Sequence, residues 1–306
     1  MTKPEALQGS RGLTVIVPCY NEEGGVTQGM KDLIDVVSGL GLPFEILAVD
    51  DASEDRTLSC LEAFGDGIRI LRNPRNMGYG AALKHGLRKA RYDFIAITDA
   101  DGTYPPEHLP DLVKLVVEEG ADMAVGARTG DKVAVPMIRK PAKWFLGRLA
   151  NFVAGQRIPD INSGLRVFRR DAAMQAYTLY PDGFSFTTTI TLAMMTNGFD
   201  VRYCRINYLK RIGRSKIHPI REPVNFVLLI TRISLYFAPL KLFVPVSLGL
   251  VALSIAWGLA SYLLLDQFAD VTTLILFVTG LQLGVLGMLA EMMNKRLHQD
   301  FQKRSW

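Results

Sequence analysis

Two long uncharged stretches near the C-terminus constrain the fold of this chain more than any other feature. The first, Leu242 to Leu265, would form a helix roughly 36 Å long at about 1.5 Å of rise per residue, and the second, Val271 to Ala290, one of roughly 30 Å. Only the link from Asp266 to Asp270 separates them. Uncharged helices of this length cross the hydrocarbon core of a bilayer, whereas buried core helices are usually shorter or amphipathic. The sequence therefore predicts a transmembrane hairpin.

Basic residues on both sides of the hairpin predict its orientation. Eight Lys or Arg and one acidic residue lie between residues 205 and 241, and four more basic residues lie between 295 and 304, whereas the link between the spans has none. Cytoplasmic loops carry an excess of Lys and Arg. Met1 to Gly12 also lacks the apolar core of a signal peptide. We therefore expect an integral protein of the plasma or inner membrane whose large N-terminal part and both termini are cytoplasmic.

Residues 222 to 241 predict a helix that lies in the membrane interface. A third membrane span is less favoured, because Arg232 stands in the middle of this segment. The basic flanks of the hairpin carry more positive charge than the whole chain, whose net charge is +5. The rest of the chain is therefore slightly acidic. We expect the bilayer, and no nucleic acid, as a partner.

The part of the chain from residue 13 to about residue 127 has the pattern of an α/β protein. Short apolar stretches alternate with segments of helical periodicity, and these stretches read LTVIV, EILAV, IRIL, DFIAIT and DMAVGA. This alternation is typical of a mostly parallel sheet with helices on both faces. In such sheets ligands bind beyond the carboxyl ends of the strands. The residues that follow each apolar stretch are therefore candidates for function.

Acidic residues follow three of these stretches. Glu22 comes after the first, Asp50 and Asp51 end the second, and the fourth is followed by Asp99 and Asp101. Carboxylates gathered at one sheet edge repel each other unless a cation or hydrogen-bond donors join them. A single acidic pair is also typical of a turn or helix cap, but three in succession favour a functional site. Because hard oxygen ligands suit Mg²⁺ or Mn²⁺ bound with a diphosphate, we expect a metal at Asp99 and Asp101.

Several short motifs occur in order between Leu13 and Lys216. They are VPCYNEE from Val17, DDASEDRT from Asp50, NMGYGAAL from Asn76, DADGTYPPE from Asp99, VGAR from Val125, DINSGLRVFRRD from Asp160, DGFSF from Asp182 and YLKRIGRSKI from Tyr208. With these motifs the chain resembles family 2 glycosyltransferases of the GT-A fold, specifically the polyprenyl-phosphate sugar transferases typified by dolichol-phosphate mannosyltransferase. Its hairpin resembles that of the bacterial members. The resemblance implies a cytoplasmic GT-A catalytic domain over residues 1–221, a juxtamembrane helix over 222–241, the hairpin over 242–293 (spans 242–265 and 271–290) and a cytoplasmic tail over 294–306.

The resemblance also implies which side chains contact the substrates. The nucleotide base and ribose would be contacted by Pro18, Tyr20, Glu22 and Asp50, with Asp51 close by. The phosphates would be held by Arg128, Arg166 and Arg211, with Ser215 and Lys216 closing that end of the site. Further substrate contacts are expected at Gly80, in a stretch of small residues, and at Ser163, in the turn before Arg166. The expected catalytic residues are Asp101, Asp160 and Arg166.

Some of these assignments have a structural alternative. Asp160 could orient the acceptor, act as a base or cap a turn, and Gly80 could serve either close ligand approach or tight packing. Arg211 and Lys216 belong to a juxtamembrane basic cluster that orientation alone requires. Thr103 stands where relatives often have Gln, so a contribution of this position to the metal site is open.

The implied reaction is an inverting sugar transfer from a nucleotide-diphosphate sugar, GDP-mannose or a UDP-hexose, to a membrane polyprenyl phosphate. A phosphate dianion is already a nucleophile at neutral pH, because its second pKa is about 6, so no strong base is required. Two alternatives are a membrane-anchored transferase with a glycan or protein acceptor, and a non-catalytic nucleotide-binding scaffold. Gly280 and Gly284 have the spacing of close helix packing, either in a homo-oligomer or within the hairpin itself.

Overall fold

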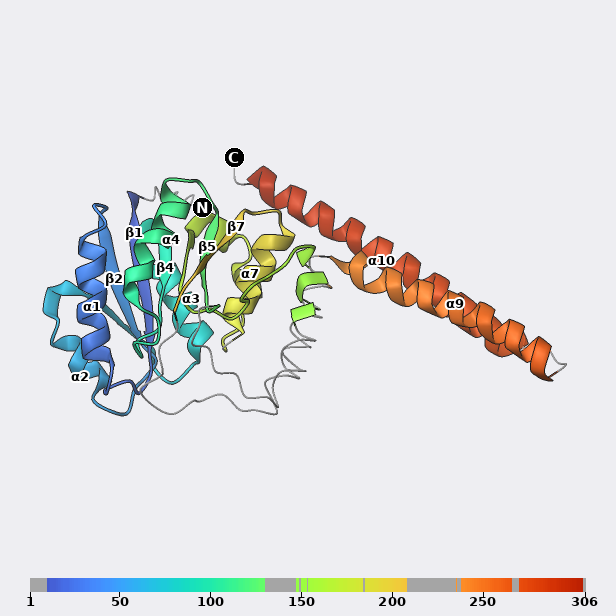
Figure 1. Ribbon diagram of the computed structural model, residues 1–306, viewed down its shortest axis with the longest axis horizontal. Helices are drawn as coiled ribbons and strands as arrows, with labels where there is room; N and C mark the ends of the chain where they lie inside the picture. The colour runs from blue at the N-terminus through green and yellow to red at the C-terminus, as the bar shows by residue number, and fades with distance from the viewer. Residues whose placement is uncertain are drawn as a thin grey trace, which may run out of the picture.

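The computed structural model describes residues 10–129, 147–148, 150–152, 154–183, 185–207, 235, 238–265 and 270–304. Figure 1 shows two parts: a layered α/β part built from the N-terminal two thirds of the chain, and a long pair of helices near the C-terminus. The predicted interfacial helix over 222–241 lies outside the described residues, apart from Leu235 and residues 238–241.

A seven-stranded mixed sheet forms the centre of the α/β part, with the strand order β3-β2-β1-β4-β6-β5-β7. The strands are β1 (Ser10–Cys19), β2 (Phe44–Asp50), β3 (Arg69–Arg72), β4 (Tyr92–Ile97), β5 (Met123–Ala127), β6 (Arg166–Arg169) and β7 (Val201–Arg205). β6 runs antiparallel to both β4 and β5, whereas the other pairs are parallel. The mostly parallel α/β sheet predicted from the sequence is confirmed, with β6 and β7 as additions.

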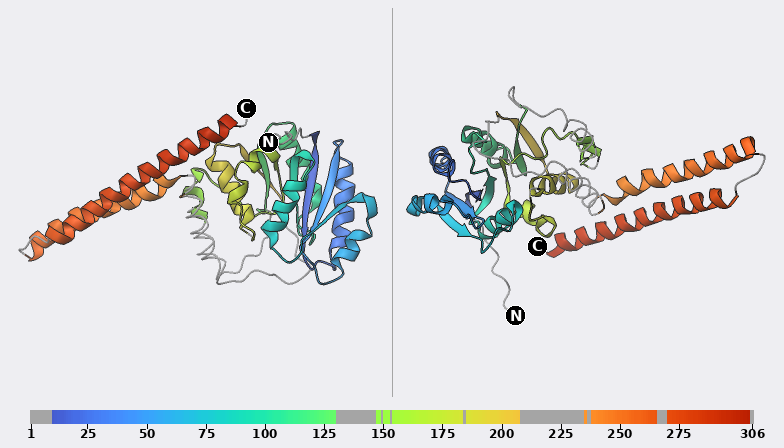
Figure 2. Two further views of the ribbon diagram at one scale, coloured as in Figure 1. Left: turned by 180° about the vertical axis from the view of Figure 1, so that it is seen from behind. Right: turned by 90° about the horizontal axis from the view of Figure 1, so that it is seen from below.

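Helices cover both faces of the sheet, because successive residues of the buried strands point to opposite sides. Val15 of β1 packs with α1 (Val26–Ser38), α2 (Thr57–Glu62) and α4 (Leu109–Val117). Ile16, the next residue, packs on the other face with α3 (Tyr79–Lys89), α6 (Arg170–Met174) and α7 (Phe186–Thr196). Figure 2 shows the resulting three layers from two further directions. The described residues of the α/β part also form three short 3-10 helices: η1 (Gly65–Gly67), η2 (Pro106–His108) and η4 (Tyr177–Leu179).

The order of the strands brings the acidic loops together. β1 pairs in parallel with β2 on one side, where Cys19 lies opposite Asp50, and with β4 on the other. The carboxyl ends of these three central strands therefore meet at one edge of the sheet. The loops that follow them carry Glu22, Asp51 and Asp99, as the sequence predicted.

The C-terminal helices, α9 (Pro239–Leu265) and α10 (Asp270–Arg304), form an antiparallel hairpin. Both are long and apolar enough to cross a membrane, over Pro239–Leu263 and Val271–Met293, and most of their large apolar side chains are exposed. The residues expected to form a separate tail continue α10 as far as Arg304. Gly280 lets the two backbones approach: a Cβ there would lie 3.1 Å from the Ser247 carbonyl oxygen, and Ser247 Oγ donates to the Gly280 carbonyl at 2.7 Å. The glycine spacing thus packs the hairpin on itself.

Candidate active site

Hydrogen bonds tie the loop after β1 to the loop after β2. The Asn21 amide donates to Ser53 Oγ at 3.1 Å, and the Glu54 amide donates to Asn21 Oδ1 at 2.8 Å. The Glu22 amide donates to Thr57 Oγ1 at 2.8 Å. Asn21 has a φ of 51°, a conformation that non-glycine residues keep mostly where their surroundings fix it. The two loops therefore form one fixed wall beside the strand ends.

A pocket of about 370 Å³ lies between this wall and the loop after β4. Six of the side chains predicted to bind substrate or metal line it: Pro18, Tyr20, Glu22, Asp51, Asp99 and Asp101. The other lining residues are Cys19, Asn76, Gly78, Tyr79, Ala82 and Ala100. The structure therefore gathers at one pocket the acidic groups that are far apart in the sequence.

Asp51 organises the far wall of the pocket. Its carboxylate accepts hydrogen bonds from Asn73 Nδ2 at 2.7 Å, from the Met77 amide at 3.0 Å and from the Gly78 amide at 2.7 Å. Asn73 is held in turn by the ring of His85, whose Nδ1 lies 2.8 Å from Asn73 Oδ1. Asp51 is thus a structural centre for the loop after β3 as well as a lining residue.

Asp50 is fully buried behind the pocket lining. Its Oδ1 accepts a hydrogen bond from the Ser53 amide at 3.1 Å. Its Oδ2 lies 3.5 Å from Arg72 Nε, close enough for an ion pair although the geometry is not that of a hydrogen bond. The predicted contact of Asp50 with the nucleotide stays a prediction.

Two hydroxyl groups hold the carboxylates of the Asp-x-Asp motif. Tyr79 Oη donates to Asp99 Oδ1 at 3.0 Å, and Thr103 Oγ1 donates to Asp101 Oδ1 at 2.6 Å. Burial of its hydroxyl group and, secondly, the charge of Asp99 raise the pKa of Tyr79 well above the usual value, so this group keeps its proton. Gly164 also lies close to Asp99: a Cβ there would be 3.0 Å from both carboxylate oxygens.

These two carboxylates fit a divalent cation that binds together with a diphosphate. Mg²⁺ and Mn²⁺ are bound by one or two carboxylates with substrate phosphates and water completing the shell. Within the described part of the chain no third His, Cys, Asp or Glu gathers with Asp99 and Asp101. Because a carboxylate has about four lone-pair positions, the hydrogen bonds from Tyr79 and Thr103 are compatible with a cation at the same carboxylates.

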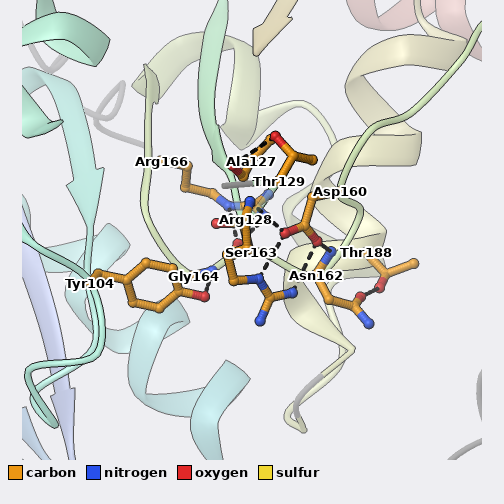
Figure 3. A network of polar contacts seen from close by, with 10 residues as sticks. All are labelled: Tyr104, Ala127, Arg128, Thr129, Asp160, Asn162, Ser163, Gly164, Arg166 and Thr188. Atoms are coloured by element: carbon orange, nitrogen blue, oxygen red, sulfur yellow. Dashed lines mark hydrogen bonds and ion pairs between the residues drawn. The ribbon is translucent and has the colours of Figure 1, made fainter. Parts of the chain in front are cut away.

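Asp160 and Arg128 form a bidentate ion pair beside the pocket (Figure 3). Arg128 Nε and Nη2 donate to the two carboxylate oxygens at 2.7 and 2.9 Å, and the Arg128 amide donates to Asp160 Oδ2 at 3.1 Å. The Asn162 amide donates to the other oxygen, so Asp160 also caps a turn. Burial raises the pKa of Asp160, but the hydrogen bonds and charge of Arg128 outweigh it and leave the pKa below its ordinary value. A carboxylate with a lowered pKa is a poor base, so these contacts favour the structural role.

Arg166 is completely buried. Its guanidinium group donates to the Ser163 carbonyl, to the Thr187 carbonyl at 3.0 Å and to Thr191 Oγ1 at 3.1 Å. Burial lowers the pKa of Arg166, and nearby groups including Tyr79 partly offset this lowering. Arg166 therefore sits beneath the site, where its contacts favour a positioning role over the predicted direct contact with phosphate.

Residues 14–176 match the glycosyl transferase family 2, and residues 238–295 match the GtrB C-terminal hairpin. This chain belongs to glycosyl transferase family 2. It is 29% identical over 255 residues to a low-salt glycan biosynthesis hexosyltransferase of Haloferax volcanii, and this match covers 80% of this chain and 60% of the relative's length.

Other relatives match over most of their length. An undecaprenyl-phosphate mannosyltransferase of Micrococcus luteus is 29% identical over 66% of this chain and 86% of its own. An undecaprenyl-phosphate 4-deoxy-4-formamido-L-arabinose transferase of Shewanella sediminis is 25% identical over 95% of this chain and 89% of its own. Among solved structures, glucosyl-3-phosphoglycerate synthase from Mycobacterium tuberculosis with Mn²⁺, UDP and phosphoglyceric acid has a TM-score of 0.56 at 18% identity, covering 75% of this chain and 80% of that one. That likeness shows the fold.

The remaining predicted residues of this family 2 transferase differ in how the structure places them. Gly80 lies outside the pocket lining, and a Cβ there would be 2.1 Å from the Pro181 carbonyl oxygen, so tight packing accounts for this glycine. Ser163 is buried and its carbonyl accepts from Arg166. A substrate contact by either stays a prediction. Three further predicted residues lie outside the described part of the chain: Arg211, Ser215 and Lys216.

Sequence reasoning missed three of the residues that contact the acidic groups: Asn73, Tyr79 and Gly164. It left open a contribution of Thr103 to the metal site, and in the structure Thr103 donates to Asp101. Three of these four residues lie inside the quoted motifs, but the motifs do not tell which carboxylate each would contact. Only Thr103, two residues from Asp101, has a partner close enough in sequence to suggest the hydrogen bond.

Proposed function

We propose that this protein is an inverting glycosyltransferase that moves a sugar from a nucleotide-diphosphate sugar to a membrane polyprenyl phosphate. The observation that carries the proposal is the pocket in which Asp51, Asp99 and Asp101 meet, in a chain that also has a hairpin able to cross a membrane. Relatives named for undecaprenyl-phosphate acceptors support it, one of them over 95% of this chain. The donor would be GDP-mannose or a UDP-hexose.

The donor would lie along the carboxyl ends of the central strands. Pro18, Tyr20 and Glu22, which line the pocket, would form the wall for base and ribose, with Asp51 close by. Its diphosphate would reach Asp99 and Asp101, which would hold it through Mg²⁺ or Mn²⁺. Such a cation, when bound, stabilises the charge that develops on the leaving diphosphate.

The transfer itself requires positioning more than a base. An oxygen of the acceptor phosphate would attack the anomeric carbon, the bond from that carbon to the diphosphate would break, and the nucleoside diphosphate would leave with inversion of the carbon. Because the acceptor is largely a dianion near neutral pH, no proton has to be removed. The pairing of Asp160 with Arg128 supports this: Asp160 holds the guanidinium of Arg128, whose side chain is 24% exposed and would contact the incoming phosphate.

The membrane placement follows from the same proposal. The two spans would anchor the α/β part, and the segment over 222–241 would lie in the interface where the lipid phosphate sits. By the positive-inside rule, the basic flanks of the spans would put the catalytic domain, residues 1–221, and both termini in the cytoplasm. Arg211, Ser215 and Lys216 would close the phosphate end of the site from the membrane side.

The test is transfer by the purified full chain in lipid nanodiscs. The chain is incubated with undecaprenyl or dolichyl phosphate, Mn²⁺ or Mg²⁺, and a panel of radiolabelled UDP-hexoses and GDP-mannose. We expect label in the organic phase with one donor, and loss of at least about 100-fold in Asp101→Asn because the leaving group is no longer stabilised. Label on a glycan or protein acceptor instead would favour the first alternative, and absence of transfer with every donor would favour the scaffold.

A further inference from the structure

The segment that precedes α3 is fixed from two sides. On one side the Asp51 carboxylate holds the amides of Met77 and Gly78. On the other side the backbone of residues 181–183 lies so close that a Cβ at Gly78 would be 2.6 Å from the Asp182 carbonyl oxygen. Gly78 also has a φ of 100°, which favours glycine. The backbone at Tyr79, the next residue, is therefore held in one position.

From this fixed position the Tyr79 side chain reaches the metal site. Its hydroxyl donates to Asp99 Oδ1 at 3.0 Å, between residues 20 apart in sequence. Gly164 comes so close to the same carboxylate that a Cβ there would lie 3.0 Å from both of its oxygens, which leaves no space for a side chain. Asp99 is thus approached by a hydroxyl group and a glycine that come from two other parts of the fold.

We propose that Tyr79 is a positioning residue for the metal site, which orients Asp99 and links it to the loop that Asp51 fixes. The hydrogen bond to Oδ1 fixes the orientation of the Asp99 carboxylate, which lines the pocket where the cation would bind. Thr103 provides the local counterpart on Asp101, donating at 2.6 Å. The inference rests on the proposed function only through the metal site. It concerns Tyr79, to which the sequence motifs gave no role.

The physical consequence is a specific loss of metal affinity. Without the hydroxyl, the Asp99 carboxylate gains rotational freedom that metal binding must then remove. Removing a hydrogen bond that orients a metal ligand typically costs about 10- to 100-fold in metal affinity. Binding of a nucleotide without metal should change little, because Phe keeps the ring that lines the pocket and the proposed base and ribose wall is built from the loops after β1 and β2.

The experiment compares the full chain with Tyr79→Phe in nanodiscs. Mn²⁺ binding is measured by electron paramagnetic resonance in the presence of whichever of UDP and GDP binds the wild type, and nucleotide binding without metal is measured by calorimetry. We expect about tenfold weaker Mn²⁺ binding and little change in metal-free nucleotide binding. Asp99→Asn should abolish the difference, because Tyr79 acts through that carboxylate. Tyr180→Phe, which removes a buried hydroxyl that donates to the Ala173 carbonyl at 2.6 Å, is the matched control.

The outcomes separate this inference from the proposed function. Unchanged Mn²⁺ affinity in Tyr79→Phe, with a wild type that binds metal and transfers sugar, overturns the inference alone. A wild type that binds no Mn²⁺ with either nucleotide overturns the metal site and the inference with it. Should Tyr79→Phe fail to fold, ultraviolet difference spectra of the wild type decide: Mn²⁺ must produce a tyrosine difference band, and its absence refutes the proposal.

Discussion

Asp160→Asn distinguishes a structural Asp160 from a catalytic base. The substitution removes the negative charge from a pair whose side chains are only 12% and 24% exposed, and it replaces one of two accepting oxygens with a donor. A hydrogen bond to a charged group contributes about 1.5–3 kcal/mol, and one of the two bonds can persist with Asn. We therefore expect a loss of about 2 kcal/mol in the free energy of unfolding.

The loss should appear in thermal unfolding of the purified chain. For a domain of about 200 residues, 1 kcal/mol shifts Tm by roughly 2–4 °C, so Tm should fall by roughly 4–8 °C. The difference in Tm between the wild type and Asp160→Asn should shrink as the pH becomes acidic. Because the pKa of Asp160 is lowered in the folded state, the stabilisation is fully present above the ordinary value of 3.8 and is lost as pH falls through the lower folded pKa.

Activity provides the refuting result. If Asp160 is structural, turnover should fall by less than about tenfold and the pH profile of turnover should keep its shape; removal of a general base costs about 100- to 10,000-fold. The reasoning would be refuted by a variant whose Tm equals that of the wild type, whose turnover falls about 100- to 10,000-fold and whose pH profile of turnover loses its acidic limb. The matched control is Asp171→Asn, since Asp171 pairs with Arg169 but is 65% exposed. It should cost less than about 1 kcal/mol.

Three further substitutions test the packing around the site and in the hairpin. Gly164→Ala should lower sugar transfer by about tenfold or more, measured with the lipid acceptor, because its Cβ would lie 3.0 Å from both oxygens of a metal-site carboxylate. Thr103→Val should weaken Mn²⁺ binding about tenfold through loss of the 2.6 Å bond to Asp101, and Thr103→Ser should restore it. Gly280→Ile should lower the thermal stability of the chain by about 1–3 kcal/mol through overpacking against α9, whereas Gly249→Ile, where nothing lies within 4 Å of a Cβ, should not.

The elements that the sequence predicted well are those whose pattern is local. β1, β2 and β4 are continuous apolar stretches, and the acidic loops after them meet because parallel strands share one edge. α7 was not predicted, because its Thr-rich sequence is buried on every side and has no amphipathic period. Two hydroxyl groups on α7 donate to carbonyls of the helix itself: Thr191 to the Thr187 carbonyl at 2.8 Å, and Thr196 to the Leu192 carbonyl at 2.7 Å. These bonds form only once the helix exists.

The site was predicted in its acidic groups and missed in the groups that orient them. Asp51 and Asp99 stand out because acidic residues at strand ends are costly unless they are used. Tyr79 and Gly164 carry no such signal: a tyrosine and a glycine have many roles, and their contact with Asp99 depends on how three separate loops meet. Arg128 and Asp160 are 32 positions apart in the sequence, so no local pattern predicts that they form a pair.

The contacts of Arg166 suggest another role than the predicted phosphate contact, which stays a prediction. An arginine after a Ser-Gly turn is read as a phosphate ligand because the substrates are anionic, yet burying a guanidinium is costly unless its donors are satisfied. Here carbonyl oxygens satisfy them: the Ser163 carbonyl on one side and the Thr187 carbonyl of α7 on the other. The first of these bonds fixes the peptide just before Gly164, the residue that packs against Asp99. Arg166 would therefore influence catalysis through the shape of that turn, so that Arg166→Lys, with one nitrogen in place of a fork, should impair the site without any direct phosphate contact being lost.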